Sequence, residues 1–127
     1  MEKDKLINLI SERYNSLPEH LWEKTPEFVV FRHISNRKWF ALIMTVPAKV
    51  LGIQSDVKMN IINLKCDELI QGSVIDNEHI FPAYHMNKLK WITVCIDKAS
   101  DDELLSLIEM SFNLTNRNKS LKINGGL

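Results

Sequence analysis

Three runs rich in β-branched and aromatic residues decide the fold: FVVFRH at 28–33, KWFALIMTV at 38–46 and KMNIINLK at 58–65. Such residues suit the pleated, half-buried surface of a sheet. Residues 35–37, Ser-Asn-Arg, supply turn chemistry between the first two runs. Pro47 ends the second run because proline cannot donate to a strand ladder. Three strands joined in this way predict an antiparallel meander.

Helical signals lie on both sides of the meander. Apolar residues recur at helical spacing over 5–17, which predicts an amphipathic helix with Leu6, Leu9, Ile10 and Leu17 on its apolar face. Residues 66–75 fit a short helix with Asp67 as its N-cap. Ser100 followed three residues later by Glu103 forms a capping box that opens a last helix.

Two further strand-like runs, 80–85 and 90–96, are separated by a hairpin-sized loop at 86–89. The predicted order is therefore α-β-β-β-α-β-β-α. Strand runs interrupted by helices indicate the α+β class, here a two-layer sandwich with the helices on one face of an antiparallel sheet. A length of 127 residues suits one domain, over 1–115, followed at 116–127 by a polar, basic tail that we expect to be flexible.

The sequence indicates a cytoplasmic protein that does not contact membranes. No apolar stretch approaches the roughly 18–20 residues that span a bilayer, and the N-terminus lacks the pattern of a signal peptide. Cys66 and Cys95 stand apart in the chain, and neither belongs to a Cys-x-x-Cys pair. They are expected to be small buried hydrophobes in a reducing compartment rather than a disulfide.

Charge is balanced over the chain but segregated along it. The chain has 16 basic and 16 acidic side chains, which excludes a uniformly basic protein. The strand segments 28–65 and 85–98 carry a net charge of +7 and the tail +3, whereas the helical segments and their flanks carry −10. A surface polarised in this way steers an anionic partner. Ordinary solvated faces explain the same asymmetry equally well.

Strand alternation predicts which side chains share a face of the sheet. One face is expected to carry Trp39, Ala41, Asn63, Lys65, Tyr84, Trp91 and Thr93, and the other, beneath the helices, Phe40, Leu42, Ile62, Leu64, Ile92 and Val94. A sheet face with tryptophan, tyrosine, lysine and asparagine is typical of surfaces that stack bases and bind phosphates. Alternatively, the tryptophans belong to the core or to a dimer interface, because the strand at 38–46 is apolar on both faces.

Signals of catalysis and metal binding are weak. The four histidines, at 20, 33, 79 and 85, lack metal-ligand spacing, and no phosphate-cradling or nucleophile motif is present. These residues favour a binding protein over an enzyme and indicate no cofactor, metal or catalytic set. Tyr84, His85, Asn87 and Lys88 gather four polar groups at a hairpin that could bind a small anion or donate protons. A solvated turn explains them equally well.

Several motifs, in order along nearly the whole chain, resemble the MmcQ/YjbR family of small bacterial proteins. They are LWEK at 21–24, VFRH at 30–33, NRKWFALIM at 36–44, NLKCD at 63–67, FPAYHMNK at 81–88 and WI at 91–92. Two positions depart from the family pattern: Lys90 replaces a common histidine, and Glu68 a common proline.

The resemblance implies a fold of order α-β(3)-α-β(2)-α, similar to secretion-chaperone-like and CyaY-like (frataxin-like) arrangements. Members of the family are widely labelled DNA-binding, and the resemblance implies no reaction. Together with the segregated charge, it leads to the hypothesis of a DNA-binding protein whose site comprises Arg32, His33, Lys38, Trp39, Lys65, Tyr84, His85, Asn87, Lys88, Lys90 and Trp91.

Two other functions remain open at this stage. A protein-interaction adaptor, which includes a self-associating homodimer, would use the apolar second face of the strand at 38–46. A small-anion-binding protein would use the cluster at 84–88. No specific protein partner is indicated.

Overall fold

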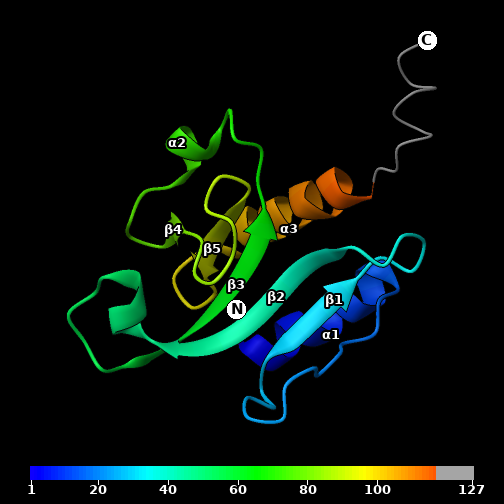
Figure 1. Cartoon of the computed structure of the whole chain (residues 1–127), viewed down its shortest axis with the longest axis horizontal. Helices are drawn as coiled ribbons and strands as arrows, with labels where there is room; N and C mark the ends of the chain where they lie inside the picture. Colours follow the sequence, from blue (N-terminus) through cyan, green and yellow to red (C-terminus); the bar gives the residue numbers. More distant parts are fainter. Residues whose placement is uncertain (117–127) are drawn as a thin grey trace.

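A computed structural model describes residues 1–116, which form three helices, a short 3-10 helix and five strands (Figure 1). The predicted tail at 116–127 lies, beyond Asn116, outside the described residues. In chain order the elements are α1 (Lys3–Tyr14), β1 (Val29–Arg32), β2 (Trp39–Pro47), η1 (Ala48–Leu51), β3 (Lys58–Lys65), α2 (Gln71–Val74), β4 (Ile80–Pro82), β5 (Trp91–Cys95) and α3 (Asp101–Thr115).

The five strands form one antiparallel sheet in the order β1-β2-β3-β5-β4. The first three strands are the predicted meander, and β3 has the predicted bounds. Helices α1 and α3 lie behind the sheet in Figure 1, on one face of it. The predicted α+β class and element order are confirmed.

The main core lies between the sheet and the helices α1 and α3. Leu6 and Ile10 of α1 and Leu104 and Ile108 of α3 pack in one cluster with strand residues. The strand members of this cluster are Val29, Phe31, Phe40, Ala41, Ile43, Ile62, Leu64, Ile80, Ile92 and Val94. We call this surface of the sheet the helix-side face.

A bulge near the start of β2 changes the predicted distribution of side chains between the two faces. Phe31 pairs with Ala41, but the next residue, Arg32, pairs with Trp39, so Phe40 is the extra residue. A bulge places two successive residues opposite one and shifts the alternation of the strand. Phe40 and Ala41 therefore both face the helices, whereas Leu42 faces away from them. The predicted places of Ala41 and Leu42 were wrong for this reason.

A buried hydroxyl from α3 fills the gap at the bulge. Ser111 Oγ donates a hydrogen bond to the carbonyl oxygen of Phe40 at 2.6 Å and accepts one from the N–H of Lys65 at 2.8 Å. These two backbone groups lie just beyond Ala41 and Leu64, the last pair of the β2–β3 ladder. Because buried backbone groups require partners, Ser111 compensates for the irregularity of β2.

The opposite surface of the sheet, the loop-side face, carries a second apolar cluster. Its buried members are Val30, Leu42, Met44, Val46, Ala48, Met59, Ile61 and Cys95. Phe28, Trp39, residues of η1 and Met86 pack partly buried against it. Segments without long helices thus cover this face, and the apolar second face of β2 is buried within the chain itself.

The two shorter helical predictions needed correction. Helix α1 ends at Tyr14 because Asn15 adopts a left-handed conformation (φ 49°), and Leu17, predicted on its apolar face, is 81% exposed. Asp67 is not a helix N-cap: its Oδ1 accepts the N–H of Leu69 in a turn, and α2 begins only at Gln71. In both places a side chain that favours turns, Asn15 or Asp67, replaces the helical conformation that the sequence pattern predicted.

Two further structural observations bear on the sequence predictions. Cys66 and Cys95 are buried free thiols, as predicted, and burial raises the pKa of both. Among residues 1–116, no helix combines the length and the apolar character needed to cross a bilayer.

Candidate functional site

Four of the predicted site residues form a row across one end of the loop-side face. The guanidinium of Arg32 on β1 lies 5.9 Å above the ring of Trp39 on β2, and the ammonium of Lys65 on β3 lies 5.4 Å from the ring of Trp91 on β5. The strand order and register place these residues in the sequence Arg32, Trp39, Lys65, Trp91. We call this alternation of cations and indole rings the cation–aromatic row.

Further charges surround the row. Lys38 and Lys90 are exposed and precede Trp39 and Trp91 directly. Burial lowers the pKa of Lys65, and the positive charges of Lys90 and Lys38 nearby lower it further.

Two carboxylates partly compensate this charge. Glu19 lies 3.2 Å from Nε of Arg32 and 3.6 Å from a guanidinium nitrogen of Arg37, so it balances the β1 edge. Glu68 lies 4.0 Å from the ammonium of Lys90, and both side chains are about half exposed, so this contact is weak. The lysine side of the row therefore keeps its positive character.

A closed ring of hydrogen bonds joins the loop after β4 to the centre of the sheet. Thr93 Oγ1 donates to Oδ1 of Asn63 (2.5 Å), Asn63 Nδ2 donates to the carbonyl oxygen of Tyr84 (2.7 Å), and the N–H of Tyr84 donates to Thr93 Oγ1 (2.9 Å). Asn63 and Thr93 are fully buried. They share the loop-side face with the tryptophans, as predicted, but they position the loop and have no exposed surface for a ligand.

In the predicted polar cluster at 84–88, two of the four side chains bind the backbone of their own loop. Lys88 Nζ donates to the carbonyl oxygen of Ala83 at 2.7 Å, and Asn87 Oδ1 accepts the N–H of Leu89 at 2.9 Å. His85 adopts a left-handed conformation (φ 59°), and its ring lies 4.0 Å from that of Tyr84. The cluster is a hydrogen-bonded turn that presents His85 to solvent.

His33, by contrast, is buried on the helix-side face, so it is not available to a ligand of the row. Its Nε2 lies 2.7 Å from Oγ1 of Thr115, and its ring packs against Phe40 and Phe112. Burial lowers the pKa of His33. Asn36 Nδ2 donates to the carbonyl oxygen of the same Thr115, so the turn after β1 secures the C-terminal end of α3.

The comparisons with known proteins place the chain in a family. The YjbR family model matches residues 13–114. The chain belongs to the YjbR family. The uncharacterised protein YyaQ of Bacillus subtilis is 36% identical over 116 residues, which cover 91% of this chain and 98% of that protein.

Solved structures similar to this YjbR protein share its fold. A crystal structure of a Pseudomonas syringae protein has a TM-score of 0.87 and 43% identity, over 91% of this chain and 99% of the other. A Deinococcus radiodurans protein matches with a TM-score of 0.60 and 27% identity, over 98% and 87%. The family resemblance drawn from the sequence motifs is confirmed.

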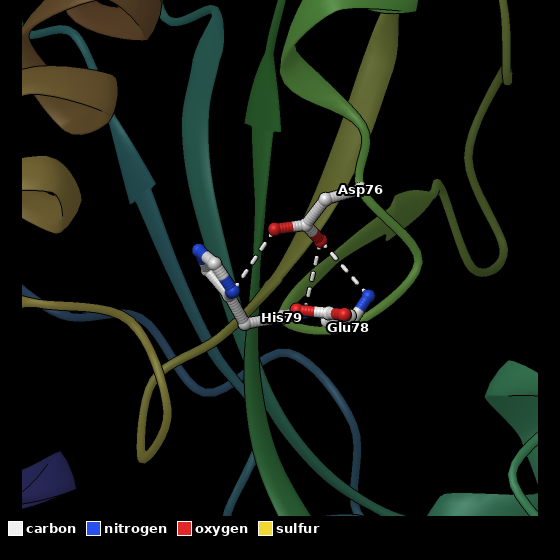
Figure 2. A group of neighbouring side chains, drawn as sticks. All are labelled: Asp76, Glu78 and His79. Atoms are coloured by element: carbon white, nitrogen blue, oxygen red, sulfur yellow. Dashed lines mark hydrogen bonds and ion pairs between the residues drawn. The ribbon is translucent and has the colours of Figure 1, made fainter.

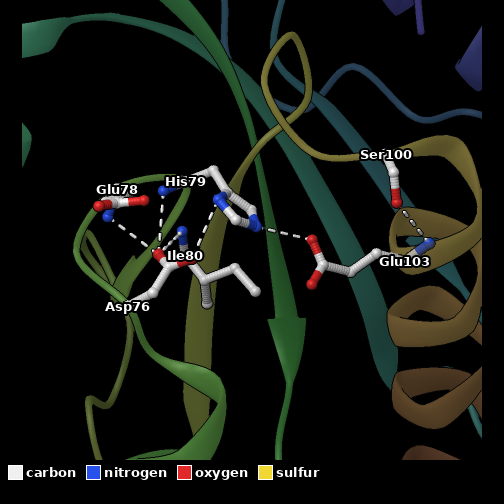
Figure 3. A network of polar contacts seen from close by, with 6 residues as sticks. All are labelled: Asp76, Glu78, His79, Ile80, Ser100 and Glu103. Atoms are coloured by element: carbon white, nitrogen blue, oxygen red, sulfur yellow. Dashed lines mark hydrogen bonds and ion pairs between the residues drawn. The ribbon is translucent and has the colours of Figure 1, made fainter.

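A polar clasp that sequence reasoning missed joins the turn before β4 to α3 of this YjbR protein. Oδ1 of Asp76 accepts the N–H groups of Glu78, His79 and Ile80 at 2.9–3.0 Å, as Figure 2 shows in part. His79 then lies between two carboxylates, with Nδ1 2.9 Å from Asp76 and Nε2 2.7 Å from Glu103 (Figure 3). Ser100 accepts the N–H of Glu103, as the capping box requires, but the Glu103 carboxylate binds His79 instead of returning to Ser100.

The atoms of this clasp have the composition of a metal site but already have partners. Asp76, Glu78 and His79 offer ligand atoms within 4.8 Å of one another. Both oxygens of Asp76 and both ring nitrogens of His79 are hydrogen-bonded within the chain. In the sequence, Asp76 and His79 stand three residues apart, which suits a contact between them. This spacing does not indicate the contact with the distant Glu103.

Proposed function

We propose that this protein binds single-stranded DNA across the loop-side face, and that the cation–aromatic row carries the contact. The supporting observation is the alternation of Arg32, Trp39, Lys65 and Trp91 over four neighbouring strands. Indole rings stack on bases of any sequence, and neighbouring cations bind the phosphates that link those bases. Lys38 and Lys90 extend the positive charge along the edge of the row.

The form of the row favours a single strand over a duplex. The two tryptophans are half-buried side chains on a sheet, so they offer a flat platform. The faces of paired bases are hidden within the stack of a duplex, whereas unpaired bases are free to lie on an aromatic platform. The helices α1 and α3 pack on the opposite face and are therefore not placed to enter a groove beside the row.

The observations that motivated the two other functions are weaker in the folded chain. The apolar residues of β2 that suggested self-association are covered by Phe28, Met86 and residues of η1. Lys88 and Asn87, which suggested a small-anion site, make hydrogen bonds to the backbone of their own turn. DNA binding at the row therefore has the strongest support.

The test is a binding titration with a fluorescently labelled oligothymidylate at several salt concentrations, monitored by anisotropy. The double variant Lys65→Glu, Lys90→Glu is compared with Lys58→Glu, Lys98→Glu. Lys58 lies at the other end of β3 from Lys65, and Lys98 follows the far end of β5. Both pairs change the net charge equally, so only the position differs.

We expect the variant Lys65→Glu, Lys90→Glu to bind at least tenfold more weakly than the unmodified chain. The slope of log K against log salt should fall by about 1.4, since each phosphate contact on a single strand contributes about 0.7. Trp91→Leu should cost about 1–3 kcal/mol of binding free energy, the usual contribution of one stacked base. The same titration with Arg117, Lys119 and Lys122 changed to glutamine distinguishes the contribution of the row to DNA binding from that of the basic tail. Absence of binding at low salt, or equal weakening by both lysine pairs, would refute the proposal.

A further inference from the structure

A cavity of about 400 Å³ lies beside the row on the loop-side face. Its lining comes from separate segments: Trp22, Thr25 and Phe28 before β1, Trp39, Leu42 and Met44 on β2, and His85 and Met86 after β4. A volume near the lower end of the usual range for ligand sites, about 300–1,000 Å³, suits a small molecule rather than a peptide. The hydrogen-bonded ring of Asn63, Thr93 and Tyr84 holds the loop that carries His85 and Met86.

The walls of the cavity are suited to a flat ring. Trp22 stands almost perpendicular to Trp39 (86°, centroids 6.0 Å apart) and steeply inclined to Phe28 (75°, 6.1 Å). Inclined rings offer a planar aromatic ligand both the face and the edge contacts that such rings prefer. The thioethers of Met44 and Met86 add polarisable contacts of the kind that sulfur makes with aromatic rings.

The lining offers an ionic ligand no charged side chain as a partner. None of its side chains is a carboxylate, a lysine or an arginine. A cationic ligand would find no carboxylate among these side chains, and the guanidinium of Arg32 over the Trp39 ring is already paired with Glu19. An anionic ligand would lack a buried basic partner. The polar side chains that remain are the hydroxyl of Thr25 and the imidazole of His85, which suit hydrogen bonds to ring heteroatoms or carbonyl oxygens.

We propose that this cavity binds an uncharged, planar heteroaromatic ring system of the size of a purine. The ring lies among Trp22, Phe28 and Trp39, with the two methionines at its edges, and its polar atoms face Thr25 and His85. Such a ring is either a free small molecule or a base of a bound strand. Trp39 belongs to both the row and the cavity, but the cavity does not need the lysines of the row, so binding of the ring is tested separately from the proposed DNA binding.

The test uses caffeine, a neutral and soluble purine, with cyclohexanol as a saturated-ring control. The chain has three tryptophans, and their indole N–H signals in a ¹⁵N-correlated NMR spectrum report on separate places. Trp22 and Trp39 line the cavity, whereas Trp91 does not. We expect caffeine to shift the Trp22 and Trp39 signals saturably with one dissociation constant, and cyclohexanol to leave them unchanged.

Two variants decide the result. Trp22→Ala removes a wall that is 37% exposed and lies outside the strands, and it should weaken caffeine binding, read from the Trp39 signal, about tenfold or more. The matched control, Leu89→Ala, changes an exposed side chain outside the lining and should bind as the unmodified chain does. No shifts, equal non-saturating shifts of all three indoles, or unchanged affinity in Trp22→Ala would overturn the proposal.

A second experiment distinguishes a base of a bound strand from a free small molecule as the occupant of the cavity. Oligothymidylate is added to the caffeine-saturated protein, and displacement of caffeine from Trp22 would assign the cavity to a base of the strand. Simultaneous binding would assign it to a free small molecule. If Lys65→Glu, Lys90→Glu abolishes oligonucleotide binding but leaves caffeine binding intact, the two sites are separate.

Discussion

Both faces of the sheet bury apolar side chains, but they are covered by different kinds of structure. Ile61 and Ile62 are adjacent in β3, both fully buried, and belong to opposite faces. Ile62 lies beneath the helices α1 and α3, whose length and regular hydrogen bonds hold their packing in place. Ile61 lies beneath η1 and loop residues. The helix-side face is a closed core, while the loop-side face retains a cavity and the cation–aromatic row.

Burial alone therefore does not distinguish a structural face from a binding face. Long helices fill the space above a sheet continuously, whereas short segments cross it at intervals and leave space between them. Segments with few buried contacts are also the ones that open most readily. The candidate sites therefore lie where cover is supplied by loops.

The substitutions Ile62→Ala and Ile61→Ala should change the stability of the chain most. We expect Ile62→Ala to lower the free energy of unfolding by about 4 kcal/mol and Ile61→Ala by about 2 kcal/mol, because loops collapse into a new cavity more easily than packed helices do. Urea titration of both variants measures the difference. Equal losses would show that the two faces are equally rigid.

Ser111→Ala tests how the helix-side face accommodates its bulge. Loss of the hydroxyl leaves the Phe40 carbonyl and the Lys65 N–H without their partner, which should cost about 2–3 kcal/mol of unfolding free energy. Ser106→Ala, an exposed serine on the same helix, is the control and should change stability little. A small effect of Ser111→Ala would mean that water or a shifted backbone replaces the hydroxyl.

His33 provides a pH test of the closed face. Because burial lowers the pKa of His33 in the folded chain, protonation favours the unfolded chain. Its contribution to stability is present above the usual histidine pKa, about 6.5, and is lost progressively as the pH falls below that value. The variant His33→Phe should lose less stability than the unmodified chain between pH 7 and pH 5. Parallel pH profiles by thermal unfolding would contradict this role.

The smallest effect is expected at the clasp, which is largely exposed. Burial works to raise the pKa of Asp76, but three backbone N–H donors and His79 outweigh it and lower the value to about 2. The stabilisation by Asp76 is therefore present above its usual pKa of 3.8 and is lost as the pH falls toward 2. At pH 7, Asp76→Ala should cost about 1 kcal/mol, a value reduced by solvent exposure.

The control for the clasp is Asp56→Ala, which changes an exposed carboxylate in the loop before β3. It should alter stability little, and its acid unfolding profile should match that of the unmodified chain. If Asp76→Ala shows the same acid profile as Asp56→Ala, the clasp does not contribute to stability.

Local sequence patterns predicted the helices and strands because these elements depend mainly on residues that are neighbours in the chain. The alternation over 58–65 predicted the bounds of β3 correctly. Ser100, which accepts the N–H of Glu103, is the N-cap of α3, as predicted. Four residues that the sequence analysis predicted for a binding site, Arg32, Trp39, Lys65 and Trp91, share one surface, while their role stays a prediction. His33 belongs to the same strand run, but a partner 82 residues away, Thr115, accounts for its burial.

The sequence by itself determined the order of helices and strands, the α+β class and the family, since periodicity, caps and motifs are properties of short segments. The faces that Ala41 and Leu42 occupy follow from the packed chain, where the bulge at Phe40 is hydrogen-bonded to Ser111 of a distant helix. The tertiary structure also decided that Asp76, His79 and Glu103 form a clasp and that a cavity lies beside Trp39. The physical reason is the same in each case: contacts between distant segments depend on how the whole chain packs, which no local pattern records.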